Sequence, residues 1–82
     1  MREVEWAGTA LEDMAALDKR IARRVKQAVE RFANTGAGSV KRLQGIDPPE
    51  YRLRVGDYRV RLHVEDEIVQ VLRVRNRREA YR

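Results

Sequence analysis

The sequence predicts a small α+β domain in which a pair of helices packs on one face of an antiparallel sheet. Three observations support this fold class. Apolar residues recur at helical spacing through residues 10–32, and they alternate with polar residues through 51–64. A chain of 82 residues also has room for only one core, which buries roughly 60–65% of the unfolded surface. We therefore expect residues 1–82 to form a single domain.

The chain is expected to begin with a short strand and a helix. Residues 3–6 alternate polar and apolar side chains, which is typical of a strand, and we expect Trp6 to lie in the core. Thr9 and Glu12 have the spacing of a capping box. They predict that the first helix begins just before Ala10.

A second, longer helix is predicted after Asp18, which is a candidate N-cap residue. The segment 34–38 contains two glycines and predicts the end of this helix. Its buried stripe is expected to consist of apolar residues at helical spacing, namely Ile21, Val25, Ala28, Val29 and Phe32.

The second half of the chain predicts three antiparallel strands. Residues 51–55 alternate strictly, and Gly56-Asp57 has the composition of a two-residue hairpin turn. The alternation continues through 58–64, and a polar turn then leads into 68–74. The last run is almost continuously apolar, which predicts a central strand. Two tyrosines flank the hairpin and are expected to pack rather than to bind ligand: Tyr51 and Tyr58.

Alternation on these strands also predicts a basic face. If the helices cover the apolar side, the opposite side collects Arg52, Arg54, Arg59, Arg61 and His63. The tail 76–82 can fold back beside them.

The net charge of +5 comes mainly from the second half of the chain. Residues 1–40 contain seven basic and six acidic side chains (7 − 6 = +1), and residues 41–82 contain eleven and seven (11 − 7 = +4). Arginine suits phosphate and stacks on bases, so a polyanion is a natural partner. Charge alone equally allows a solvated surface.

Composition excludes several other classes of function. Without cysteine and with a single histidine, the chain has no disulfides, thiolate ligands or histidine cluster, and we expect no metal or other cofactor. There is no apolar run near the ~20 residues of a membrane span, and no signal-peptide pattern. We expect a soluble cytoplasmic protein.

Several blocks of the sequence resemble the RelE/ParE toxin superfamily. They are residues 40–45, 51–60 and 71–81, together with Glu5-Trp6 and the helical pair, so the resemblance covers essentially the whole chain. It implies a RelE-like fold with two N-terminal helices on a small, mainly antiparallel four-stranded sheet. It also implies a cognate protein antitoxin, with which the toxin can form a higher-order assembly.

The RelE branch is favoured, and its toxins enter the ribosomal A site and cut messenger RNA by attack of a ribose 2′-OH on the adjacent phosphate. The functional positions of that branch correspond here to Arg52, Arg54, Arg59, Arg77 and Tyr81. The chain departs from the pattern in two ways. The basic positions of the first hairpin strand are often Lys in relatives and are both Arg here, and Asn76 stands where many relatives have His or Lys.

These residue types suit phosphate binding better than proton transfer. Arg59 and Arg77 are expected to hold the scissile phosphate and stabilise its charge, while Arg52 and Arg54 position neighbouring phosphates. Tyr81 can stack on a base or exchange a proton. Further RNA contacts are expected from Lys41, Arg42, Arg61, Arg75 and Arg78.

The general base is left open by the sequence. His63 is the candidate acid/base residue on the arginine side, while Glu50 and Glu79 are weaker candidates because acids among arginines are more often salt-bridge partners. Two other functions also stay open. One is a ParE-like, non-enzymatic inhibitor of DNA gyrase, and the other is an inactive antitoxin-binding domain.

Overall fold

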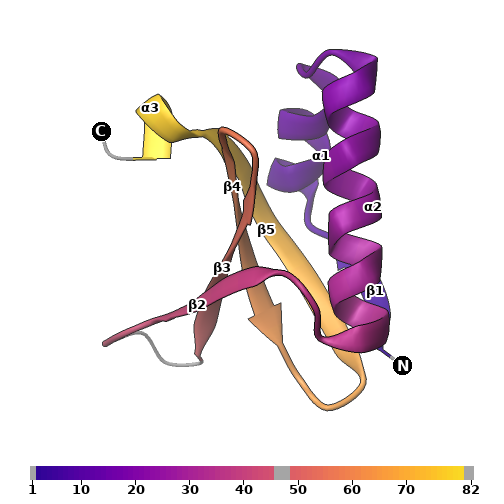
Figure 1. Ribbon diagram of the computed structural model, residues 1–82, viewed down its shortest axis with the longest axis vertical. Helices are drawn as coiled ribbons and strands as arrows, with labels where there is room; N and C mark the ends of the chain where they lie inside the picture. Colours follow the sequence, from indigo (N-terminus) through magenta and orange to yellow (C-terminus); the bar gives the residue numbers. More distant parts are fainter. Residues whose placement is uncertain (1, 46–48, 81–82) are drawn as a thin grey trace.

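The computed structural model describes residues 2–45 and 49–80, which form a five-stranded sheet with two long helices on one face (Figure 1). The elements in chain order are β1 (Glu3–Trp6), α1 (Gly8–Ala15), α2 (Lys19–Thr35), β2 (Ser39–Leu43), β3 (Glu50–Val55), β4 (Tyr58–Val64), β5 (Ile68–Asn76) and α3 (Arg77–Ala80). The α+β class is confirmed. The expectation of four strands is wrong, because β2 is a fifth, and α1 and α2 follow β1 rather than opening the chain.

The strand missed by sequence reasoning is β2, which lies at the edge of the sheet beside β3. Only Val40 and Leu43 are partly buried there, and the residues between them are exposed and basic. An edge strand of this kind lacks the period-two alternation of a half-buried strand, because the helices do not cover it evenly.

The strand order is β1-β5-β4-β3-β2. β1 runs parallel to β5, and the other neighbouring pairs are antiparallel. β5 lies between β1 and β4, so the central position predicted from its apolar run is confirmed. Gly56 begins the two-residue turn between β3 and β4 with a φ of 57°, a conformation that glycine adopts without strain.

The core lies between the two helices and one face of the sheet. Its buried members from α2 are Val25, Val29, Phe32 and Ala33, and those from β3, β4 and β5 are Leu53, Val60, Leu62, Val69, Val71 and Val74. Trp6, Tyr51 and Tyr58 pack against this cluster, as expected. Figure 1 shows α1 and α2 on the same side of the sheet, and within residues 2–45 and 49–80 the short α3 near the β3–β4 turn is the one helix away from that side.

The predicted ends of α2 are confirmed, whereas the predicted start of α1 is wrong. Asp18 caps α2, because its side chain accepts a hydrogen bond of 2.9 Å from the Arg20 N–H. Gly36 ends α2 in the left-handed conformation. The capping box at the start of α1 is wrong: the N-cap is Ala7, and the Thr9 hydroxyl instead donates to the Leu72 carbonyl oxygen at 2.7 Å, since α1 lies along β5.

Candidate nucleic-acid interface

The face of the sheet turned away from the helices is strongly basic. Adjacent strands place opposite residues side by side on the same face, so the pairing register identifies its members. Its described carboxylates are Glu50 on β3 and, by the same register, Glu3 and Glu5 on β1. Its cations are Lys41, Arg52, Arg54, Arg59, Arg61, Arg73 and Arg75, and we call this surface the arginine face.

Arginines stand directly opposite one another across the strands of this face. The register pairs Arg52 with Arg61 and Arg54 with Arg59 between β3 and β4. It also pairs Arg59 with Arg75 and Arg61 with Arg73 between β4 and β5. Like charges directly opposite are destabilising by roughly 0.2–1 kcal/mol per pair. The fold therefore carries an electrostatic cost here that an anionic ligand would relieve.

The arginine face is hollowed in two places. One open hollow of about 290 Å³ is lined by Leu43, Arg52, Arg59, Arg61, Arg73 and Arg75. The other, of about 200 Å³, is lined by Ser39, Val40, Lys41, Arg52, Arg54 and Arg59. Because Arg52 and Arg59 line both, the two hollows adjoin and form a shallow basic depression across the four strands β2, β3, β4 and β5.

One end of this face lies at the β3–β4 turn. There Arg59 folds back over the turn, and its Nη1 donates to the carbonyl oxygens of Gly56 at 3.4 Å and Tyr58 at 3.2 Å. The backbone N–H of Arg77 donates to the Asp57 carbonyl oxygen at 2.6 Å, which fixes α3 to the same turn. The exposed Arg77 thus comes from the end of the chain to the end of the sheet that holds Arg59.

The other end of the face holds an acid, a histidine and an arginine together. Glu50 accepts a hydrogen bond of 3.0 Å from the Nε of Arg61, pairs with its Nη2 as well, and lies 3.4 Å from the Nε2 of His63. The Glu50 side chain is only 12% exposed. Sequence reasoning treated Glu50 and His63 as separate candidates for the base, although counting back from the hairpin turn puts them opposite each other.

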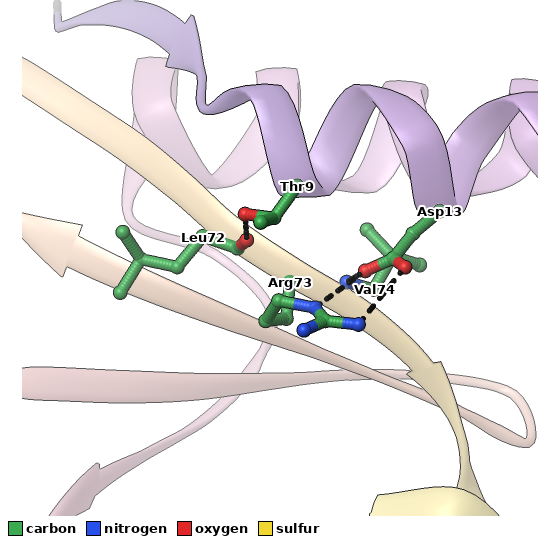
Figure 2. Close-up of polar contacts among 5 residues, drawn as sticks. All are labelled: Thr9, Asp13, Leu72, Arg73 and Val74. Carbon is green, nitrogen blue, oxygen red and sulfur yellow. Dashed lines mark hydrogen bonds and ion pairs between the residues drawn. The ribbon is translucent and has the colours of Figure 1, made fainter.

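A third charged contact joins α1 to β5 and was not anticipated. The Asp13 carboxylate accepts hydrogen bonds from Nε and Nη2 of Arg73 at 2.9 and 3.2 Å and from the Val74 N–H at 2.9 Å (Figure 2). Burial acts to raise the pKa of Asp13, but these hydrogen bonds and the charges of Arg73 and Arg75 outweigh it and hold the pKa below its usual value. Sixty residues separate the partners, so no local pattern could reveal the contact.

The remaining candidate residues fall in different places. Lys41 lies on the arginine face, but Arg42 is the next residue of β2 and points to the opposite side, so the two cannot contact one RNA segment on that face. Arg78 is exposed on α3. Tyr81 and the side chain of Glu79 lie outside the described residues.

Within residues 2–45 and 49–80, no three His, Asp or Glu side chains come together as metal ligands. No helix among these residues is both long and apolar enough to cross a membrane.

Comparison with protein families identifies the class to which this fold and basic face belong. Residues 4–81 match the family described as ParE toxin of type II toxin-antitoxin system, parDE. Because the match spans nearly the whole chain, the protein belongs to this family of toxins, and the expected RelE/ParE superfamily is confirmed. Comparison with curated protein sequences gives no match.

Solved structures of RelE and YafQ toxins share the fold. In the RelB-RelE antitoxin-toxin complex from Methanococcus jannaschii, the matched chain is 26% identical, with a TM-score of 0.77 over 94% of each chain. The archaeal RelE-RelB complex from Pyrococcus horikoshii OT3 matches at 24% identity and a TM-score of 0.78, over 93% of this chain and 94% of that one. The E. coli DinJ-YafQ complex matches at 16% identity and a TM-score of 0.80 over the full length of both chains.

Proposed function

We propose that this toxin is a ribosome-dependent endoribonuclease that cuts messenger RNA on its arginine face, by attack of a ribose 2′-OH on the adjacent phosphate. One observation supports this most directly: four Arg–Arg pairs stand across neighbouring strands around two adjoining open hollows. A fold under no functional demand would gain stability by replacing some of these arginines. A sugar-phosphate chain is a ligand that turns their repulsion into attraction.

The roles of the arginines follow from where they lie. Arg59 and Arg77 both lie at the β3–β4 turn, where together they can hold the scissile phosphate and stabilise the charge that develops on it. Arg52 and Arg54 would bind the flanking phosphates from β3, next to Arg59. Arginine stays protonated in proteins, so these residues clamp the phosphate and do not accept its proton.

His63 is badly placed to act on that same phosphate. It lies four residues from Arg59 on β4, which is about 13 Å along the strand. Its pairing with Glu50 keeps His63 beside Arg61, away from the phosphate at the turn. We keep Tyr81 as the candidate for proton transfer, on the strength of the family resemblance.

Ribosome dependence has a physical reason in this arrangement. The described part of the arginine face supplies cations for the phosphate, and the residues that stand opposite Arg59 on β3 and β5 are themselves arginines. The hollows are also open to solvent, so they do not exclude water from the reacting atoms. We therefore expect the isolated domain to bind RNA but to cleave it poorly, and the ribosome in the cytoplasm to hold the messenger in the reactive geometry.

A cognate antitoxin is the second partner that we propose. The similar RelE and YafQ chains come from complexes with RelB and DinJ antitoxins. An antitoxin segment with acidic side chains would bind the arginine face by charge complementarity and would block RNA at the same time.

The cleavage proposal is tested by substituting Arg59 and Arg77, the two arginines proposed to hold the scissile phosphate. Arg59→Ala and Arg77→Ala should each abolish toxicity in growing cells while the purified variants keep wild-type melting temperatures, because both side chains are at the surface and have only weak contacts to the turn. His63→Gln is the matched control on the same face and should keep most of the cleavage. Toxicity that survives both arginine substitutions would defeat the nuclease assignment.

A second function, inhibition of DNA gyrase without catalysis, is favoured by the match to the ParE toxin family. Mapping the 5′ ends of transcripts after induction separates the two. Cuts in phase with codons support the ribosome-dependent nuclease. Loss of DNA supercoiling with intact transcripts supports gyrase inhibition, and growth unaffected by induction indicates an inactive, antitoxin-binding domain.

A further inference from the structure

We propose that Arg73 is an additional phosphate-binding residue of the arginine face and that Asp13 is the residue that positions its guanidinium. This inference rests on the proposed function and deepens it. Arg73 lines the larger hollow with Arg59, Arg61 and Arg75, and its side chain is 35% exposed. It stands directly opposite Arg61 across β4 and β5. An RNA chain bound in the hollow would therefore meet Arg73.

The contact that positions Arg73 forms at the edge of β5. β1 pairs with β5 only as far as Trp6 and Val71, so beyond that point another element must satisfy the backbone of β5. α1 does so: the Thr9 hydroxyl donates to the Leu72 carbonyl oxygen at 2.7 Å, and the Val74 N–H donates to Asp13 at 2.9 Å. Figure 2 shows both contacts on the same side of the strand.

The Asp13 carboxylate is thus anchored to the backbone before it meets Arg73. It then accepts two hydrogen bonds from the guanidinium, at 2.9 Å from Nε and 3.2 Å from Nη2, which fixes the plane of the group as well as its place (Figure 2). A long arginine side chain that is already ordered loses less conformational entropy when it binds a phosphate. Asp13 thereby pre-organises one wall of the hollow.

A bulge in the sheet puts Arg73 where this contact is possible. The register pairs Arg61 with Arg73 but Leu62 with Val71, so Leu72 is an extra residue in β5. Such a bulge increases the local twist and re-aims the side chains beside it. Val71 and Val74 both remain buried in the core, while Arg73 between them reaches the hollow and, at the edge of the strand, Asp13.

Positioning and simple charge make opposite predictions for Asp13→Asn. The substitution removes a negative charge beside Arg73 and Arg75, so a purely electrostatic role predicts tighter RNA binding. If Asp13 positions Arg73, the variant should instead bind RNA more weakly and cleave at least about tenfold more slowly, because the carboxylate no longer holds the guanidinium ready for the phosphate. Weaker binding and slower cleavage at temperatures well below melting are not expected of a contact that only stabilises the fold.

The experiment compares Asp13→Asn, Arg73→Gln, the double variant and Thr9→Val. Thr9→Val is the matched control, since it removes the neighbouring contact between α1 and β5 without changing any charge. Single-turnover cleavage is measured on ribosomes programmed with a defined messenger, and binding by fluorescence anisotropy with a short single-stranded RNA that carries a 2′-deoxy sugar at the cut site. Melting temperatures are recorded for each variant, so that assays are run well below them.

Arg73→Gln should weaken RNA binding about tenfold and lower the slope of log K against log salt by about 0.7, the effect of one lost phosphate contact on a single strand. The double variant should cleave like Arg73→Gln, because Asp13 acts through Arg73. Thr9→Val should cleave and bind close to the wild type, because Asp13 keeps its own hydrogen bond to the Val74 N–H and still holds Arg73. Wild-type binding and salt slope in Arg73→Gln, or additive losses in the double variant, would overturn the inference. If the wild type binds this RNA but does not cut on the ribosome, the proposed function fails while the binding assay still decides the role of Arg73. If it neither cuts nor binds, both proposals fail.

Discussion

The separation of an apolar and a basic face on β3 can be tested at two adjacent residues. Leu53 is 1% exposed and belongs to the core, whereas its neighbour Arg54 is exposed on the arginine face. A Leu→Ala change at a buried site costs about 2–5 kcal/mol, and the cost is high where the surroundings cannot collapse. Gly38 packs tightly against Leu53, since a Cβ on Gly38 would lie 2.9 Å from the Leu53 Cδ1. We therefore expect the free-energy cost of Leu53→Ala to lie in the middle of this range.

For a chain of 82 residues the total stability is about 4–12 kcal/mol, so a loss of about 3 kcal/mol is a large share of it. With about 4–8 °C per kcal/mol for a domain of this size, Leu53→Ala should lower Tm by about 12–24 °C. Arg54→Ala should stay within about 0.5 kcal/mol of the wild type, because the side chain is exposed and stands opposite the like charge of Arg59. Thermal unfolding followed by circular dichroism, with urea titrations to compare m-values, measures both. If Arg54→Ala is as destabilising as Leu53→Ala, the two faces of β3 are not divided as described.

Three further predictions follow from other contacts. Gly38→Ala should cost about 1–3 kcal/mol in urea unfolding, because its φ of 140° disfavours a side chain and the new Cβ meets Leu53; equal stability to wild type would contradict that geometry. The Asp13 pKa is lowered in the fold, so its stabilising contribution is complete above the unfolded pKa of about 3.9 and is lost as the pH falls through the lower folded value. The wild type should therefore lose more stability than Asp13→Asn when urea titrations are repeated between about pH 6 and pH 2, and parallel curves would argue against the ion pair. Finally, the Kd of the antitoxin complex should rise steeply between low and high salt, and a Kd indifferent to salt would remove the electrostatic basis of that interface.

Much of the fold could be predicted because its elements follow local rules. The alternation through β3 and β4, with Gly56-Asp57 between them, sets both the hairpin and its register, and the register alone puts Arg52 opposite Arg61. Asp18 predicts the start of α2 for an equally local reason, since a cap depends only on the residues that follow it. β2 was not predicted, because the edge of a sheet imposes little hydrophobic pattern on the strand that forms it.

The candidate site, like the fold, could be predicted from the sequence in part only. The sequence by itself determined which side chains of β3 and β4 share the arginine face, because the period of two in a strand leaves no choice once one face is buried. Lys41 on the edge strand β2 and Arg73 beside the bulge in β5 were placed there only by the tertiary structure. Only the tertiary structure decided that Thr9 bonds to the edge of β5 instead of forming a capping box. It also decided that Asp13 binds the same edge and holds Arg73 there. The physical reason is that the unpaired backbone beyond β1 needs hydrogen-bond partners, and which element supplies them depends on packing between segments about sixty residues apart.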